Sequence, residues 1–367
     1  VEAGGDAASR SRDAQLARQQ AANMKLELRS VGDLSEVRFL GEGSYGKVLS
    51  GLVMPFLAAP MEVAVKVSMP GSSRPERLDR EVALLSSLPA HANVCPMLAM
   101  VTQAARAVGE SMRVAAGPQG ELDRMRRVLR DLGDATVSVA VMPRLACDMR
   151  TVMWVDEERG AARALPVRVV RGLWAQLLDA MSFLQVQNVA HCDLHPGNVM
   201  LSRDGTLTLI DFGSAERPQV SDGTLFLSRR QLSDGSIMVV PWRHGKQEHV
   251  CPEARLASSC SAEVPLGGQW SWEAGVMMHM LASGGLHPFP AYPRSAEWAA
   301  QRAEAAAGSA LSQLSESEQR AMWSLLSSAA SKRASVPAAR AALIREWGGE
   351  AACAALVAEA KEACRAI

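Results

Sequence analysis

A short polar stretch near the middle of the chain carries the residue types that phosphoryl transfer requires. Residues 191–198 read His-Cys-Asp-Leu-His-Pro-Gly-Asn, which places Asp193 five residues before Asn198. Asp211-Phe212-Gly213 follows, and two short apolar runs lie between the motifs. This spacing provides one carboxylate to orient a hydroxyl, together with an amide and a second carboxylate to hold magnesium. We therefore predict Asp193 as the catalytic base and Asn198 and Asp211 as Mg²⁺ ligands.

Residues upstream provide groups that can hold a nucleotide. Gly41, Gly43 and Gly46 fit the pattern G-x-G-x-x-G-x-V, in which a hairpin backbone closes over phosphates because glycine lacks a Cβ. Lys66 follows in a strand-like run, and Glu81 follows in a segment with helical periodicity. Each feature alone is typical of a turn or a surface charge, but their order favours a nucleotide site. We predict that Glu81 pairs with Lys66 and fixes it against the α- and β-phosphates.

In this order the motifs resemble those of eukaryotic-type protein kinases, over roughly residues 35–345. Cys251-Pro252-Glu253 resembles the A-P-E motif, Trp272 resembles the start of the central C-lobe helix, and His287-Pro288-Phe289 resembles the loop after it. Arg333 takes the place of the arginine that pairs with the A-P-E glutamate, so a buried Glu253–Arg333 ion pair is predicted. The resemblance implies an α+β, bilobal protein kinase-like fold with a small β-rich N-lobe and a large helical C-lobe. It also implies ATP and Mg²⁺ as cofactors and a protein substrate.

The resemblance assigns a complete site. The ATP-binding residues are Gly41, Gly43, Gly46, Val48, Ala64, Lys66, Met142, Pro143, Leu145, Asp148 and Met200. Among them Met142 lies at the back of the pocket, Pro143 and Leu145 form the hinge, Asp148 reaches the ribose and Met200 forms the adenine floor. The catalytic set is Asp193, Lys66, Glu81 and His195, and the metal ligands are Asn198 and Asp211.

The central motif departs from the family at two positions. Cys192 replaces the arginine that receives the activation-loop phosphate in many relatives, a non-RD arrangement, so activity is expected to be independent of that phosphate. His195 stands where relatives directed to Ser/Thr carry lysine. We predict either weaker catalysis that improves as falling pH protonates the histidine, or a neutral replacement. His191 is expected to pack the loop and to take no part in proton transfer.

Two further departures lie downstream. Lys246 takes the register of a small threonine that contacts the catalytic aspartate, so it is predicted to pair with Asp193 or to bind substrate phosphate. Trp270 takes the register of an aspartate that caps the catalytic-loop backbone. Either Gln269 replaces that aspartate as acceptor, or the loop is held in another way. Between these motifs, residues 224–227 and 236–240 are predicted to pair as a hairpin.

The bulk composition agrees with a two-lobed enzyme. A chain of 367 residues is long enough for two separate cores. Its 39 basic and 39 acidic residues cancel, which argues against nucleic acid or a strongly anionic membrane as partner. No apolar run reaches the roughly 18 residues needed for a transmembrane segment. The seven cysteines lack C-x-x-C spacing, so buried free thiols are favoured over zinc ligands or over Cys251–Cys260 and Cys353–Cys364 disulfides.

The expected organisation is an N-terminal arm (1–33), an N-lobe (34–142) with an insert (103–136), a C-lobe (143–345) and a C-terminal helical extension (346–367). The arginine-rich insert is either a docking surface or a solvated basic helix. The chain begins at Val1, which suggests a fragment or a processed form, so its localisation, in the cytoplasm or as a secreted effector, stays open, as does its oligomeric state. The arm, the insert and the altered loops also resemble the rhoptry-type kinases that intracellular parasites secrete.

Three functions remain open. The leading one is a Mg²⁺- and ATP-dependent protein kinase, with Ser/Thr specificity inferred from the His-Pro-Gly-Asn form of the loop. A pseudokinase that binds nucleotide or a partner is favoured by the altered loops and opposed by the intact metal ligands. A small-molecule kinase is suggested because the loop also resembles that of antibiotic and choline phosphotransferases. Cys251-Pro252-Glu253 and the Arg333 site argue against this third function.

Overall fold

The computed structural model divides the chain into two compact units, Val1–Leu145 and Ala146–Ile367, and each is described by itself. The residues that the structure describes are 30–43, 46–54, 60–68, 76–116, 120–156, 161–163, 165–217, 219–221, 224–226, 229–231, 237–239, 249–252, 268–289 and 309–365. The first unit is a small lobe built on a β-sheet and the second is mainly helical, which confirms the expected α+β fold. The sequence places the boundary between N-lobe and C-lobe after residue 142, and this division stays a prediction.

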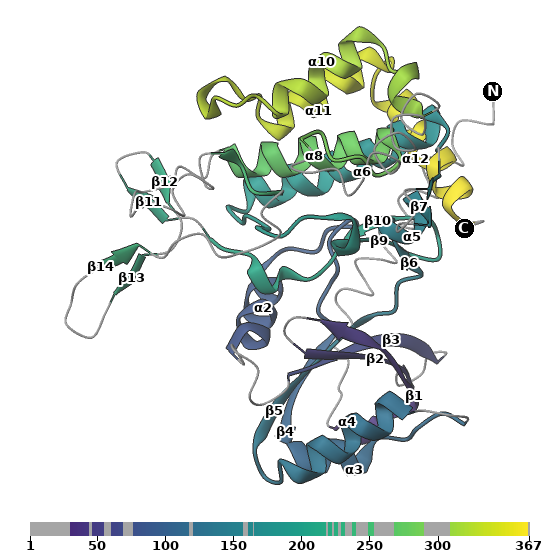
Figure 1. Cartoon of the computed structure of the whole chain (residues 1–367), viewed down its shortest axis with the longest axis vertical. Helices are drawn as coiled ribbons and strands as arrows, with labels where there is room; N and C mark the ends of the chain where they lie inside the picture. The colour runs from purple at the N-terminus through teal and green to yellow at the C-terminus, as the bar shows by residue number, and fades with distance from the viewer. Residues whose placement is uncertain are drawn as a thin grey trace, which may run out of the picture. The chain divides into compact units, whose positions relative to one another are not determined.

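A five-stranded antiparallel sheet is the framework of the first unit (Figure 1). Its strands are β1 (Leu34–Gly43), β2 (Gly46–Val53), β3 (Met61–Val67), β4 (Ala99–Ala104) and β5 (Thr136–Pro143), in the order β1-β2-β3-β5-β4. A 3-10 turn, η1 (Val31–Asp33), precedes the sheet, and its Val31 is fully buried. The folded lobe therefore begins before the predicted start at residue 34. The rest of the predicted arm, 1–29, lies outside the described residues.

Different helices cover the two faces of this sheet. One face packs against α3 (Ala105–Ser111) and α4 (Gly120–Asp131), where valines from β3 and β5 meet apolar side chains of both helices in the core. The opposite face meets α2 (Glu76–Ser87), whose Leu78 and Val82 pack against Ala140 of β5. Valine fits both faces of the sheet because its branched Cβ packs well on a pleated surface.

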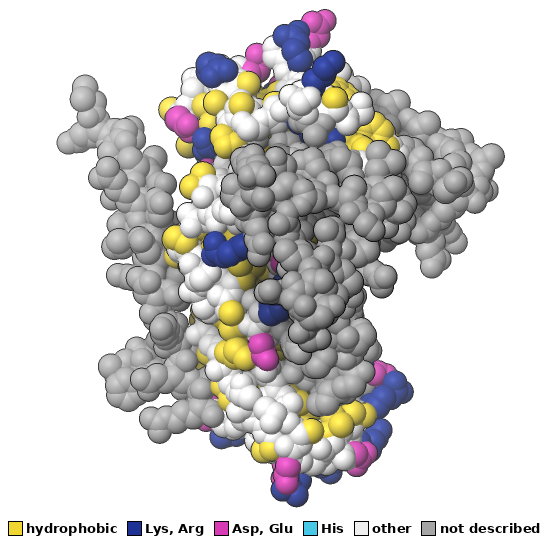
Figure 2. Space-filling model, turned by 90° about the vertical axis from the view of Figure 1, so that its left-hand side faces the viewer, with side chains coloured by type: hydrophobic (Ala, Val, Ile, Leu, Met, Phe, Trp, Pro, Cys, Tyr) yellow, Lys and Arg dark blue, Asp and Glu magenta, His cyan; other side chains and the backbone are white. Residues whose placement is uncertain are grey.

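The insert between β4 and β5 is an amphipathic helical hairpin. Leu122, Met125 and Leu129 recur at helical spacing on α4 and are buried in the core of the lobe. The outer side carries the ion pairs Arg106–Asp134, Arg124–Glu121 and Arg126–Asp123. Figure 2 shows the two signs of charge interspersed at the lower edge of the view, where the insert lies. The predicted basic helix is therefore solvated on its outer side only, and its mixed charge gives no support to a docking role.

Helices build most of the second unit. They are α5 (Met149–Met153), α6 (Val167–Val186), α8 (Gln269–Ser283), α10 (Glu316–Leu325), α11 (Val336–Glu346) and α12 (Glu350–Arg365), with short 3-10 turns η6 (Ala310–Gln313) and η7 (Ala330–Lys332). The predicted central helix of the C-lobe is confirmed by α8, which α6 packs against. All 15 residues of α8 are buried, as expected of a helix that is apolar on nearly every side.

A small antiparallel sheet in the order β10-β9-β6 carries the predicted catalytic motifs. Its strands are β6 (Cys147–Asp148), β9 (Val199–Leu201) and β10 (Leu207–Leu209). The 3-10 turn η2 (Pro196–Asn198) leads into β9, and η3 (Phe212–Ser214) follows β10. The hairpin of β9 and β10 thus joins the two motifs in space.

Short strand pairs occupy the segment after η3. β11 (Gln219–Ser221) pairs with β12 (Thr224–Phe226), and β13 (Arg229–Gln231) pairs with β14 (Ile237–Val239). The predicted pairing of residues 224–227 with 236–240 is wrong, because β12 pairs with β11 and β14 pairs with β13. Such local pairing closes the shorter loop and so costs less chain entropy. A further pair, β7 (Trp154–Asp156) and β8 (Ala161–Ala162), follows α5.

The C-terminal extension is an integral part of the second unit. α12 lies within the predicted helical extension, and Gly348-Gly349 separates it from α11. α12 packs along α6, and its Arg365 donates through Nε to the carbonyl of Asp204, in the turn between β9 and β10, at 3.3 Å. Gly205 in that turn has φ +76°, and a Cβ there would meet the carbonyl of Lys361. A side chain at Gly205 would therefore push α12 away.

The cysteines considered for disulfides are free thiols wherever the structure describes them. Cys353 and Cys364 are free and buried, which confirms the prediction of buried thiols for this pair. Cys251 is also free, while Cys260 lies outside the described residues. Over the described part of the chain, no helix combines the length and apolar character needed to cross a membrane.

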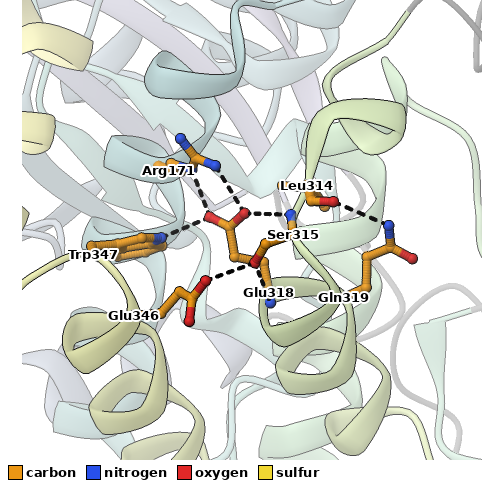
Figure 3. Close-up of polar contacts among 7 residues, drawn as sticks. All are labelled: Arg171, Leu314, Ser315, Glu318, Gln319, Glu346 and Trp347. Carbon is orange, nitrogen blue, oxygen red and sulfur yellow. Dashed lines mark hydrogen bonds and ion pairs between the residues drawn. The ribbon is translucent and has the colours of Figure 1, made fainter.

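A buried carboxylate joins three helices of the second unit (Figure 3). Glu318 on α10 accepts hydrogen bonds from Arg171 at 2.6 and 2.9 Å and from Nε1 of Trp347 at 2.7 Å. It also forms a capping box with Ser315 at the start of the helix. Burial acts to raise the pKa of Glu318, but hydrogen bonds from Arg171, Ser315 and Trp347 outweigh it and hold that pKa below its ordinary value.

We expect Glu318→Gln to lower the free energy of unfolding by about 3 kcal/mol, because the guanidinium of Arg171 loses its compensating charge. Glu359→Gln is the matched control. It removes the ion pair with Arg168. The side chains of Arg168 and Glu359 are 57% and 43% exposed, so we expect the free energy of unfolding to fall by at most about 0.5 kcal/mol. Urea unfolding at neutral pH measures both. Equally small losses would contradict the central role of Glu318.

Candidate active site

A lysine and a glutamate form a buried ion pair in the first unit. Nζ of Lys66, on β3, donates to Oε2 of Glu81, on α2, at 2.7 Å. The two side chains are only 8% and 2% exposed. Such a pair is stable because each charge compensates the other, and loss of one partner leaves a buried charge. The predicted pairing of Lys66 with Glu81 is confirmed.

Three predicted adenine contacts share a face of the sheet with Lys66. Val48 lies opposite Lys66 in the β2–β3 register, and Ala64 lies opposite Met142 in the β3–β5 register. Ala64 and Lys66 are two positions apart, and side chains two apart on a strand point to the same face. All three apolar residues are partly exposed, whereas Leu49, Val63, Val65 and Val141, which adjoin them in the strands, are buried in the core. The first unit therefore presents one face with a lysine and three apolar side chains.

The glycine-rich motif forms the closed end of the β1–β2 hairpin. Gly41 pairs with Val48, and Gly43 pairs with Gly46. A Cβ on Gly46 would collide with the carbonyl of Val67, so the close approach of β3 requires glycine there. The contact of this hairpin with nucleotide phosphates stays a prediction.

The predicted hinge falls at the boundary of the two units. Pro143 ends β5, and Leu145 is buried. Asp148 on β6 accepts hydrogen bonds from the backbone N–H and the hydroxyl of Thr151 at 2.8 and 2.9 Å, and lies 3.2 Å from Arg150. These bonds hold the start of α5. The contact of Asp148 with ribose stays a prediction, as does that of Met200, which lies half-buried on β9.

One hydrogen bond closes the catalytic loop on itself, and two more connect it to the strand that leads to Asp211. Nδ2 of Asn198 donates to the carbonyl of Asp193 at 2.9 Å. The N–H of Ile210 donates to the carbonyl of Asn198 at 3.0 Å, and Nε2 of His191 donates to the carbonyl of Ile210 at 3.0 Å. The predicted base Asp193, the predicted metal ligand Asn198 and the residue just before Asp211 are thus parts of one hydrogen-bonded structure.

The donor set of this structure fits magnesium. The amide nitrogen of Asn198 is used in the bond to Asp193, which leaves the amide oxygen as the atom suited to a cation. Asp211 provides a second hard oxygen donor and has φ 59° and ψ 70°, a left-handed conformation that costs on the order of 1 kcal/mol. Mg²⁺ keeps waters and phosphate oxygens in its shell, so two protein ligands suffice. Among the described residues, no three His, Cys, Asp or Glu side chains are grouped as a metal site.

His191 is a structural residue of the loop. It is fully buried, and burial lowers the pKa of its imidazole. Its ring packs against Phe212 with centroids 4.7 Å apart. A neutral ring held between a backbone carbonyl and an aromatic side chain is unsuited to proton transfer, in agreement with the sequence interpretation.

His195 adopts a defined tautomer beside the predicted base. The N–H of Gly197 donates to Nδ1 of His195 at 3.0 Å, so the proton of the neutral ring lies on Nε2. Nε2 lies 3.7 Å from Oδ1 of Asp193. Protonation of Nδ1 would break the bond from Gly197. This arrangement opposes the predicted gain of activity on protonation and favours the alternative of a neutral replacement.

Cys192 offers no cation to a phosphate. Its side chain is 1% exposed, and Sγ donates to the carbonyl of Ala190 at 3.4 Å. Burial raises the pKa of the thiol well above its ordinary value. Its backbone has φ 64°, which turns the chain just before Asp193. The residue therefore serves the shape of the loop.

Sequence reasoning missed one residue of the site, Glu273. Its Oε1 accepts a hydrogen bond from the backbone N–H of Leu194, next to Asp193, at 3.3 Å. Trp270, in the register of the family's aspartate, instead donates through Nε1 to the carbonyl of Val189 at 2.6 Å. Glu273 lies about one turn further along α8, from where a longer side chain reaches the loop. The sequence did contain a sign of this contact, because an acidic residue follows three positions after Trp270.

Gln269 has a different partner from the one considered in the sequence. Its Oε1 accepts from the N–H of Cys251 at 3.1 Å, and its Nε2 donates to the carbonyl of His249 at 3.5 Å. The suggestion that Gln269 replaces the aspartate as acceptor for the catalytic loop is therefore wrong. The loop is held in another way, by Glu273.

Glu273 lies in an unusual electrostatic environment for an acid. Burial raises the pKa of its carboxyl to about 8, and the Asp193 carboxylate contributes to the rise. Hydrogen bonds from Gln269 and from the backbone N–H groups of Leu194 and Cys192 act in the opposite direction but are outweighed. At neutral pH the group is therefore mostly protonated, and its carbonyl oxygen can still accept the bond from the loop.

Two predicted interactions involve residues outside the described part of the chain, Lys246 and Glu253. The Glu253–Arg333 ion pair accordingly stays a prediction. Arg333 itself donates through Nε to the carbonyl of Ser327 at 2.7 Å, and its guanidinium lies 5.0 Å from the ring centre of Trp272. These contacts fix the arginine near the start of α8.

Each unit thus carries part of the predicted set. The first unit brings together the glycine hairpin, Lys66, Glu81 and the apolar face, and the second brings together Asp193, His195, Asn198 and the strand before Asp211. Comparison with known families matches residues 34–347 to the protein kinase domain. The chain belongs to the eukaryotic-type protein kinase family. ATP binding and phosphoryl transfer to proteins are the activity class of this family, and α12 lies beyond the matched region.

The most similar curated proteins are also kinases. CBL-interacting protein kinase 4 of Oryza sativa subsp. japonica is 27% identical over 69% of this chain and 44% of its own length. The 3-phosphoinositide-dependent protein kinase B of Dictyostelium discoideum is 34% identical over 36% of this chain and 13% of its own length. Human serine/threonine-protein kinase STK11 is 30% identical over 41% of this chain and 30% of its own length. The chain spans less than half the length of each.

We expect Glu273→Gln to remove a pH dependence of stability. The folded protein keeps the Glu273 proton up to about pH 8, whereas the unfolded chain releases it near pH 4.5, as an ordinary glutamate does. Stability due to this group is therefore complete below pH 4.5 and falls as pH rises toward 8, by up to about 1.4 kcal/mol per pH unit. Glutamine has no proton to lose. The free energy of unfolding of the variant should therefore rise relative to that of the wild type as pH increases across this window.

Urea unfolding at pH 5, 6, 7 and 8 measures the difference. The free energies of unfolding of the two proteins should be similar near pH 5 and should diverge toward pH 8. Parallel curves would show that Glu273 has an ordinary ionisation in the folded state.

Proposed function

We propose that this chain is a Mg²⁺- and ATP-dependent kinase that phosphorylates serine or threonine hydroxyls of proteins. The observation that carries this proposal is the hydrogen-bonded set that joins Asp193, Asn198 and the strand before Asp211. The buried Lys66–Glu81 pair supports it, because that pair is the part of a kinase that holds the nucleotide phosphates. Family membership supports the same activity class.

Each residue has a role in this proposal. Asp193 accepts or orients the proton of the acceptor hydroxyl, while Asn198 and Asp211 hold the magnesium ion that neutralises phosphate oxygens. Lys66, kept in place by Glu81, contacts the α- and β-phosphates. Preorganised charges of this kind act where negative charge develops in the transition state, and they need no rearrangement during the reaction.

A pseudokinase is the second candidate, and one observation favours it. The positions that supply cations in many relatives hold a buried thiol at Cys192 and an imidazole at His195 whose Nδ1 already accepts a bond from Gly197. The catalytic loop therefore brings less positive charge to a transferred phosphoryl group. The presence of both predicted metal ligands, Asn198 and Asp211, favours an active kinase over a pseudokinase.

Radiolabelled ATP with Mg²⁺ and a generic acceptor protein tests the proposal. We expect incorporation by the wild type and a loss of about 10²-fold or more in Asp193→Ala and Asp211→Ala, because each removes a group that acts on the reacting atoms. Asp134→Ala is the matched control, since this aspartate lies on the insert with its side chain 80% exposed. Nucleotide binding without incorporation by the wild type would indicate a pseudokinase. ATP turnover without labelled protein would indicate a small-molecule kinase.

Phosphatase treatment of the purified protein gives a second test. Turnover should be unchanged, because Cys192 leaves an activation-loop phosphate without its usual docking cation. The measurement compares initial rates before and after treatment, with phosphate removal verified by mass spectrometry. A kinase that carries arginine at this position, treated in parallel, is the control and should lose activity. A large loss in this protein would contradict the proposal of phosphate independence.

A further inference from the structure

Two polar side chains lie on one side of the first turns of α8. Gln269 and Glu273 are four positions apart, so they are neighbours on the helix surface. Both are fully buried, in a helix whose other residues are mostly apolar. Burial of an amide and a carboxyl is costly unless their polar atoms are paired, so these two residues are expected to have specific partners.

The partners are backbone groups of two different segments. Glu273 accepts from the N–H of Leu194 in the catalytic loop. Gln269 both accepts from the N–H of Cys251 and donates to the carbonyl of His249, in the last described part of the activation segment. Gln269 and Glu273 stand one helical turn apart on α8. The two segments are therefore linked through a pair of adjacent side chains.

We propose that Gln269 and Glu273 form a clamp that holds the catalytic loop and the end of the activation segment together without a phosphate. The clamp is a regulatory feature of the site described above and rests on the proposed kinase function for its consequence. Many relatives achieve the same link with an arginine and a phosphorylated residue. Here the joining groups are a neutral amide and a buried acid, which need no modification to act.

Two contacts nearby agree with such a clamp. The ring of His249 lies 6.2 Å from the ring of His195, centre to centre, so the two segments also approach each other directly. Cys192 and Cys251, which flank the clamp, are both buried, with 1% and 0% exposure. The N–H of Leu194 and the N–H of Cys251 each donate to one residue of the clamp, which supplies the partner that a buried backbone group needs.

Hydrogen exchange of the full chain tests the clamp directly. Gln269→Leu keeps the volume of the side chain but removes its polar atoms. We expect about tenfold faster exchange in peptides that cover 249–252 and also in peptides that cover 191–198, because the two segments are coupled through the helix. Glu273→Leu should have the same effect on both peptides. Glu273→Gln, which keeps an acceptor oxygen, should restore the slow exchange of 191–198.

Gln176→Leu is the matched control. Gln176 is a buried glutamine on α6 that accepts from the N–H of Leu207 at 3.0 Å, in the same unit but away from the clamp. Its replacement should speed exchange around residue 207 and leave both clamp peptides unchanged. If Gln269→Leu affects 249–252 alone, the two residues act separately and the clamp is wrong. If neither peptide changes, Gln269 has no positioning role.

Steady-state kinetics distinguish a positioning role of Gln269 from a contribution to stability alone. In an active protein, Gln269→Leu should lower kcat about tenfold with an unchanged KM for ATP, since the nucleotide contacts lie elsewhere, and phosphatase treatment should cause no further loss. An equal change in both constants, or a thermal melt that shows global unfolding of both leucine variants and of Glu273→Gln, would overturn the proposal. Slow exchange of both peptides in an inactive wild type would refute the kinase function while leaving the clamp.

Discussion

The catalytic loop of this kinase depends on a helix that is buried along its whole length. A loop packed against the core must find partners for its backbone groups, because a buried unpaired N–H or C=O costs about 1–3 kcal/mol. The first turns of α8 provide these partners through Gln269, Trp270 and Glu273, each of which pairs with the backbone of a different segment. A mostly apolar helix with a polar beginning thus sets the geometry of the residues that carry the chemistry.

The departures from the family are connected through this helix. With tryptophan in place of the usual aspartate, the acceptor for the loop moves one turn along α8 to Glu273. A second carboxylate beside Asp193 would oppose its charge, but burial keeps Glu273 mostly protonated at neutral pH. Cys192 removes the need for charge compensation at the loop, and Gln269 holds the neighbouring segment with a neutral group. Charged interactions have been exchanged for buried neutral ones throughout this region.

The sequence predicted those parts of the site that follow from local patterns. The Lys66–Glu81 pair was predictable because strand and helix periodicity fix the direction of each side chain. Glu273 was missed because the comparison with the family examined only the position of the usual aspartate, which is Trp270 here. The contact of Glu273 depends instead on the length of its side chain and on the approach of two segments. The pairing within 219–239 was missed because turn residues mark a reversal without choosing the partner strand. The partner of Glu318 lies 147 positions away and leaves no local signal beyond the capping box.

The hydrogen bond between Gly197 and His195 affects which groups are able to neutralise phosphate charge. The bond from Gly197 holds the ring in the tautomer with its proton on Nε2, directed toward Asp193. A neutral ring of this kind can help to orient the aspartate, but it does not bring the full charge of a lysine. In the proposed reaction, charge on the transferred phosphoryl group must then be neutralised by the divalent ion and by Lys66. In that proposal, the oxygen donors of Asn198 and Asp211 are therefore the constraint on which catalysis would depend most.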